Sequence, residues 1–170
     1  LGKISVGDIT ANGLVVASLG INGAFSAGEV RTSSNFVLDA SNSYSGSINI
    51  GSVTASNVTI AMGDGSGHLT IGNWWGDGIY SEGNVLIDAS SFGGTIDTRL
   101  INASGAVTVA LGESGDFSAG EVRTSSNFVL DALNSHSGSI NIGSVTASNV
   151  TITMGDGSGH LTIGNWWGDG

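Results

Sequence analysis

The chain has 170 residues, of which 29 are glycine and none is proline or cysteine. Its formal net charge is −10 with only four Lys and Arg residues, so no nucleic-acid partner is expected, because such binding needs basic side chains that neutralise phosphates. There are no cysteines for a disulfide framework and no apolar run long enough to span a bilayer, so no membrane insertion is expected.

The predicted elements are short strands separated by glycine-rich turns. Residues 36–38 and 85–87 are continuous apolar runs, which predict strands covered on both faces. Residues 47–50, 57–60 and 68–71 alternate polar and apolar side chains, as half-buried strands do. Gly and Asp at 63–67 and 76–78 predict turns, because both residue types suit turn geometry.

A long internal repeat dominates the sequence. Residues 25–78 return as residues 117–170, an offset of 92 (117 − 25), and only three positions differ. These are Ser41, Tyr44 and Ala61, which become Leu133, His136 and Thr153. A weaker repeat at an offset of 49 divides the unit in two. The predicted organisation is 1–24 as a partial repeat or lead-in strands, 25–116 as a full unit (half-units about 25–73 and 74–116), and 117–170 as a truncated second unit. We expect the chain to be a segment of a longer protein.

The assembly that buries these strands has two solutions. One chain can coil as a β-solenoid, or several chains can wrap so that each covers the others. A half-unit of about 46 residues is longer than common single-coil repeats, which favours intertwined chains. The predicted fold is therefore all-β: an elongated, repetitive β-helix or β-prism-like fibre, formed as an intertwined homotrimer. An ice-binding solenoid is disfavoured because Thr54, Thr59 and Thr70 are unevenly spaced.

Two stretches carry a resemblance to a known group. Residues 46–60 (GSINIGSVTASNVTI) and 111–122 (LGESGDFSAGEV) resemble the shafts of bacteriophage tail fibres and central tip fibres. The resemblance implies a structural shaft in a virion tail that supports host attachment, with self-association into a homotrimer and contacts to other virion tail proteins. A bacterial surface adhesin or secreted β-filament, extracellular or on the cell surface, shares this composition and stays open as an alternative.

The tryptophan pair Trp74-Trp75 and its copy Trp166-Trp167 are the most unusual residues. Neighbouring side chains of a strand point to opposite faces, so one Trp of each pair could pack inside and the other could face solvent. An exposed Trp could stack on a sugar ring of a host-surface glycan. Packing inside the rod is the favoured interpretation, and glycan contact is the alternative.

No catalytic residue, metal site or cofactor is expected, and the chain is not predicted to be an enzyme. Acidic residues in the glycine-rich turns match no calcium-binding pattern and indicate turn chemistry; they are Asp64, Asp77, Asp156 and Asp169. His68 and His160 lack partners at metal-ligand spacing. Asp39, Asp88 and Asp131 each close an apolar strand, and this recurrence predicts turn capping rather than an acid–base pair.

Overall fold

A computed structural model describes residues 2–43, 45–73 and 76–168, with the side chains of residues 166–168 excepted. This part of the chain contains seventeen strands and no helix. The strands are β1 (Lys3–Ser5), β2 (Ile9–Ala11), β3 (Val15–Ser18), β4 (Ala24–Thr32), β5 (Phe36–Ala40), β6 (Ser47–Ala55), β7 (Val58–Met62), β8 (His68–Ile71), β9 (Ile79–Ser81), β10 (Val85–Ala89), β11 (Thr95–Ala103), β12 (Val107–Leu111), β13 (Asp116–Thr124), β14 (Asn127–Ala132), β15 (Ser139–Ala147), β16 (Asn149–Met154) and β17 (His160–Gly168).

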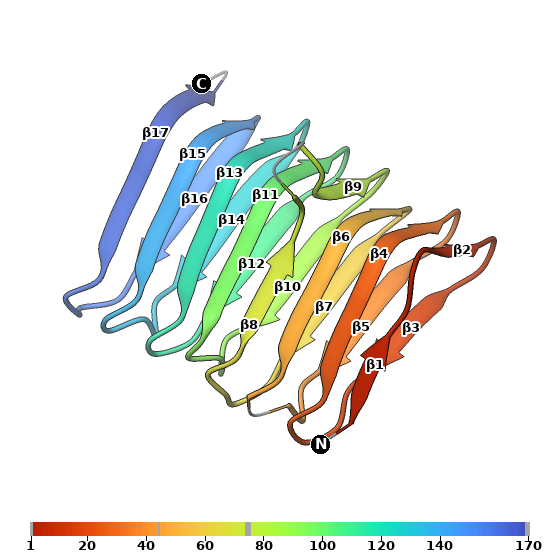
Figure 1. Ribbon diagram of the computed structural model, residues 1–170. Coiled ribbons are helices and arrows are strands. Elements are labelled where there is room, and N and C mark those ends of the chain that lie inside the picture. Colours follow the sequence, from red (N-terminus) through yellow and green to blue (C-terminus); the bar gives the residue numbers. More distant parts are fainter. Residues whose placement is uncertain (1, 44, 74–75, 169–170) are drawn as a thin grey trace.

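The strands form two parallel sheets that face each other along the molecule (Figure 1). The large sheet runs β1-β4-β6-β8-β11-β13-β15-β17, with β2 and β9 completing the interrupted strands, and the small sheet runs β3-β5-β7-β10-β12-β14-β16. The chain passes from one sheet to the other and back once per coil. This arrangement is a β-solenoid of about seven turns, and it confirms the all-β, β-helical prediction. No helix that could cross a membrane occurs in the described residues.

The core consists of columns of apolar side chains that stack from coil to coil. Alternation along each strand sends every second residue inward. In the large sheet Phe25, Ile48, Leu69, Ile96 and Phe117 pair in succession, and all five side chains are buried. In the small sheet a matching column of buried residues comprises Leu38, Ile60, Ile87, Val109 and Leu130. The two sheets thus close a continuous core within one chain.

The repeat corresponds to a whole number of coils. Phe25 and Phe117 are one repeat apart and are linked by four successive strand pairings, so the 92-residue unit spans four coils. The offset of 49 joins Val37 to Leu86 through Thr59, which is two coils. A half-unit therefore holds two coils, and its length is no argument for intertwined chains. The homotrimer stays a prediction.

Among the described residues of this one chain, none covers the outer face of the small sheet, so coverage of its strands on both faces would need a second chain and stays a prediction. Leu86 is 40% exposed and Val16, in the same outward column, is 54% exposed. The outward residue Thr59 belongs to this sheet, whereas Thr54 and Thr70 belong to the large sheet. The threonines thus form no single array.

Side-chain ladders fix the corner where the large sheet leads into the small one. The Asn57 Nδ2 donates to Asn35 Oδ1 at 3.0 Å, and Asn57 Oδ1 accepts from the Asn84 amide at 2.8 Å. The Asn84 side chain in turn accepts from the amide of Ala106 at 2.9 Å. From Asn35 to Ala106 each coil is thereby hydrogen-bonded to the next at the turn, in addition to backbone bonds such as that from the Val58 amide to Asn84 O at 3.0 Å.

Candidate ligand-binding surface

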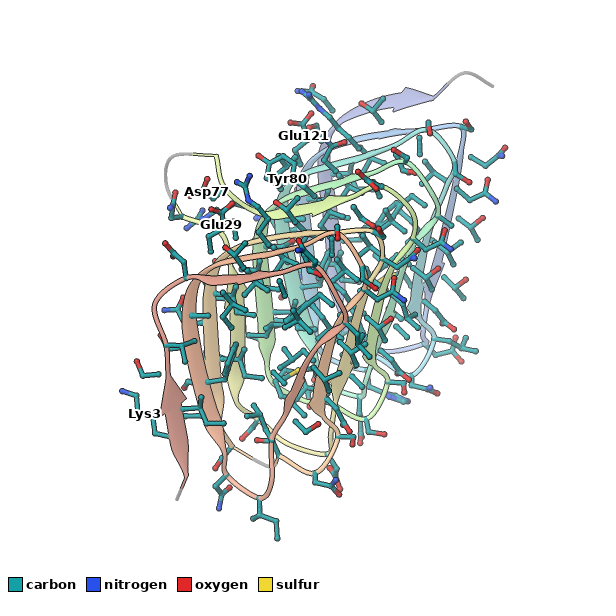
Figure 2. All side chains as sticks on the ribbon, turned by 90° about the vertical axis from the view of Figure 1, so that its right-hand side faces the viewer. Lys3, Glu29, Asp77, Tyr80 and Glu121 are labelled. Carbon is teal, nitrogen blue, oxygen red and sulfur yellow. The ribbon has the colours of Figure 1, made fainter. Side chains whose placement is uncertain are left out.

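One coil carries an insertion on the large sheet. Ile71 and Ile79 pair with Ile50 and Val53 of β6, which are separated by two residues, Gly51 and Ser52. Seven residues, 72–78, lie between Ile71 and Ile79. The chain leaves the large sheet after β8 and rejoins it at β9, and Asp77 of this segment lies out from the face of the sheet (Figure 2).

The base of this insertion is held by backbone bonds. The Gly72 amide donates to Ile50 O at 3.0 Å, and the Val53 amide donates to Gly78 O at 2.9 Å. Gly72 has φ 111°, a conformation that favours glycine, and a Cβ placed there would lie 2.5 Å from Asp77 O. The first and last residues of the segment are therefore anchored to β6.

Side chains near the insertion add further contacts. Asn73 Nδ2 donates to Asp77 Oδ2, and the Tyr80 hydroxyl donates to Gly76 O at 3.0 Å. The Tyr80 ring is half-buried and lies on the outer side of the large sheet beside Asp77 (Figure 2). The bond to Gly76 restricts where this ring can turn.

The second copy of the same sequence is arranged differently. β17 continues through to Gly168, and Trp166 and Trp167 pair with Val145 and Thr146 of β15. In the first copy the equivalent residues of β6, Val53 and Thr54, pair with Ile79 and Tyr80 of β9. One sequence thus occurs both as a strand followed by an insertion and as an uninterrupted strand.

The residues of the glycan-contact prediction lie mostly outside the part of the chain that the structure describes. Trp74 and Trp75 are not among the described residues, and for Trp166 and Trp167 only the backbone is described. Whether one ring of each pair packs and the other is exposed stays a prediction.

A shallow groove runs across several coils beside the insertion. Its outer row is Thr54, Tyr80, Asn102, Arg123 and Thr146, which occupy one outward column of the large sheet. The row at the corner is Glu82, Ser104 and Ser125. Between these rows the buried residues Ser81, Ala103 and Thr124 point inward, which leaves a furrow because alternate strand residues face opposite ways.

The groove comprises two adjoining hollows. One of about 170 Å³ is lined by Thr54, Tyr80 and Glu82, and the other, of about 380 Å³, is lined by Arg123 and Thr146. Asn102 and Ser104 line both hollows, so the two adjoin each other.

The basic residues gather on the large sheet. All four Lys and Arg residues of the chain lie in its strands: Lys3 in β1, Arg31 in β4, Arg99 in β11 and Arg123 in β13. Arg31, Arg99 and Arg123 pair with acidic residues two positions earlier on the same strand, namely Glu29, Asp97 and Glu121. These pairs are at least partly exposed and contribute little to stability, and they leave the sheet with charges of both signs.

The acidic residues that close the apolar strands cap the turns, as predicted. Asp39 Oδ1 accepts from the Ser41 amide at 3.1 Å and the Ser41 hydroxyl at 2.6 Å, and these two bonds lower the pKa of Asp39. Asp88 makes the same pair of bonds to Ser90, and Asp131 accepts from the Leu133 amide at 3.0 Å. The three carboxylates therefore share one local role.

The remaining polar candidates form no cluster. His68 and His160 are exposed at the starts of β8 and β17, and Asp64 and Asp156 are exposed in turns. Asp169 lies outside the described residues. Within the described ranges no three His, Cys, Asp or Glu side chains come close enough to hold a metal ion.

Sequence reasoning missed Tyr80, Asn102 and Arg123 as groove residues. They are 22 and 21 positions apart, and only the coil register places them side by side. An aromatic ring followed by an amide and a guanidinium is unremarkable in the sequence itself.

Comparison of the chain with protein-family models, curated proteins and solved structures gave no match. The geometry alone assigns the fold. It is a parallel β-solenoid.

Proposed function

We propose that this chain is a structural shaft segment, a stiff spacer that holds a host-binding part of a larger assembly at a distance. The supporting observation is the register of the repeat. Phe25 pairs with Ile48, and one repeat later Phe117 pairs with Ile140 in the same way. Each further unit can therefore extend both sheets and the core without a change in cross-section.

The resemblance to phage tail fibres gives this proposal its first form: a shaft in a virion tail that supports host attachment, in contact with other tail proteins. This form predicts a homotrimer, so sedimentation should give the mass of three chains of 16.9 kDa each. A second form is a surface adhesin or secreted filament. The insertion between β8 and β9 favours this second form, because a spacer alone needs no such addition to one coil. The second form predicts the mass of one chain.

The spacer role is tested by the distance between the two ends of the solenoid. The chain has no cysteine, so Ser5→Cys and Thr162→Cys give a unique pair of labelling sites, both exposed. Seven successive strand pairings link Ser5 to Thr162 along one outward column of the large sheet. At about 4.8 Å per strand, the two positions lie roughly 34 Å apart.

Single-molecule energy transfer between dyes at these two sites should give one narrow distance distribution near that value. A broad distribution, or a distance much shorter than the stacked coils require, would overturn the spacer proposal. Each labelled chain should be diluted with unlabelled chain, so that transfer between molecules does not contribute.

A further inference from the structure

We infer that the groove beside the insertion binds a neutral, extended oligosaccharide whose long axis follows the solenoid axis. The inference goes beyond the spacer role, because a stiff rod needs no ligand. It concerns side chains other than the tryptophan pairs.

The groove offers an aromatic platform. Tyr80 is half-buried on the outer face, and its hydroxyl is bonded to Gly76 O at 3.0 Å. An aromatic side chain joins a large apolar face to a polar end, which suits stacking against the C–H face of a sugar ring. Because the hydrogen bond holds the ring, little conformational entropy is lost when a ligand stacks on it.

The groove also offers polar side chains that make no hydrogen bond to other described residues of the protein. Among the described residues, no hydrogen bond engages the side chains of Asn102, Ser104 or Thr146, and Asn102 and Thr146 are exposed. An amide both donates and accepts, and hydroxyl groups do the same, so the set matches the neighbouring hydroxyl groups of a sugar.

The spacing of the coils fits an extended chain. Tyr80, Asn102, Arg123 and Thr146 follow one another in successive coils, with one side chain per strand spacing of about 4.8 Å. That spacing is close to the length of one pyranose unit in an extended polysaccharide. Successive sugars would thus meet successive side chains.

The charge of the molecule favours a neutral ligand. The chain carries a net charge of −10, which repels acidic polysaccharides. In the groove Glu82 stands at one end and Arg123 farther along, and Arg123 is already paired with Glu121. Neither sign of charge is concentrated there.

The test uses calorimetric titration of the full chain with four neutral hexasaccharides: cellohexaose, mannohexaose, xylohexaose and maltohexaose. At least one should bind. For that sugar, Tyr80→Ala and Asn102→Ala should each raise the Kd by about tenfold or more, which corresponds to the loss of roughly 1.4 kcal/mol. Tyr80→Phe should retain most of the binding, because the ring remains.

Asn141→Ala is the matched control. Asn141 is an exposed asparagine in β15 of the same sheet but outside the groove, and its removal should leave the Kd unchanged. If Tyr80→Ala impairs folding, Asn102→Ala alone carries the test, since Asn102 is an exposed side chain that makes no bond to the described protein.

Three results would overturn the inference: no hexasaccharide binds, binding survives both groove substitutions, or binding is lost only when Trp74→Ala and Trp75→Ala are introduced. The distance between labels at positions 5 and 162 should be the same in every groove variant. Failure of the groove proposal and failure of the spacer proposal are therefore distinguishable.

Discussion

Ile60 lies fully buried in the small sheet, between Leu38 and Ile87 of the neighbouring coils. Ile60→Ala should lower the free energy of unfolding by about 2–5 kcal/mol, because it leaves a cavity that the stacked coils cannot fill. Thr59→Ala, at the adjacent outward position, should change it by no more than about 0.5 kcal/mol. Urea denaturation measures both variants, and equal losses would contradict the assignment of inward and outward faces.

The Asp39 cap gives a pH dependence with a definite sign. The hydroxyl and amide of Ser41 lower the pKa of Asp39 below its usual 3.8, against a small opposing effect of burial. The unfolded chain then binds this proton more readily than the folded chain. The cap's contribution to stability is fully present above pH 3.8 and is lost as the pH falls through the lower, folded pKa.

Ser41→Leu, which introduces the residue found in the second copy, removes the hydroxyl donor and keeps the backbone amide. It should raise the pKa of Asp39 towards 3.8, as followed by NMR titration of its carboxyl carbon. Ser45→Ala, in the same turn but bonded to Asn22, is the control and should leave that pKa unchanged. If the Asp39 pKa is unchanged in Ser41→Leu, the Ser41 hydroxyl is not the main cause of the lowered pKa.

For individual residues, the sequence predicted a structural role where the same residue type recurs in the same local setting. Asp39, Asp88 and Asp131 each follow an apolar strand, and their capping role is confirmed by their hydrogen bonds. Tyr80 and Asn102 have no such recurrence. Tyr80 and Asn102 are neighbours because β9 pairs with β11, and no local sequence pattern predicts that pairing.

Among the elements, the insertion at 72–78 is expected to be dispensable for folding. Replacing these seven residues with Gly-Ser, the pair that β6 has at the same place, should join β8 and β9 into one uninterrupted strand. The free energy of unfolding should stay within about 0.5 kcal/mol or rise, since a shorter loop costs less entropy to close.

Ile79→Ala provides the comparison for that replacement. Ile79 is fully buried where the chain rejoins the sheet, so its truncation should cost about 2–5 kcal/mol. Thermal and urea unfolding measure both variants. A loss from the replacement as large as that from Ile79→Ala would mean that the insertion is part of the structural core.

The positions of the strands were largely predictable from the sequence, but the number of residues per coil was not. The strand expected at 68–71 is present with those bounds as β8, and the turns at 63–67 and 76–78 lie between strands. The coil length escaped detection because it varies. Phe25, Ile48, Leu69 and Ile96 pair in order but are separated by different numbers of residues, since the turns and the insertion differ in length.

For the whole molecule, the outer face of the small sheet combines exposed aliphatic residues with carboxylates and no basic residue. Val16 and Leu86 are exposed there, next to the column that holds Asp88 and Asp131. Like charges on an open sheet face oppose stacking against a second copy. Asp88→Asn with Asp131→Asn should therefore increase self-association, while each Asn side-chain oxygen can still accept the capping bond.

Asp64→Asn with Asp156→Asn removes the same charge from exposed turns and is the control. Sedimentation velocity over a range of concentrations should show association at lower concentration for the first variant than for the second. If the two variants behave alike, net charge alone governs association, and the position of the carboxylates on the small sheet is irrelevant.

Assembly was the least predictable property at this scale. The length of the half-unit suggested intertwined chains, yet the half-unit holds two coils that bury their apolar columns within one chain. Periodicity reports that a strand has a buried face, but it does not say whether the covering residues come from the same chain or from another. Association of three chains is still a prediction, to be decided by mass in solution.

The most direct test of the account is to insert a second copy of residues 25–116 into the chain and to measure both proteins by small-angle X-ray scattering. Four added coils should increase the maximum dimension by about 19 Å and leave the radius of gyration of the cross-section unchanged. A particle that becomes wider, or that gains volume without gaining length, would contradict the claim that each repeat adds four stacked coils to a rod.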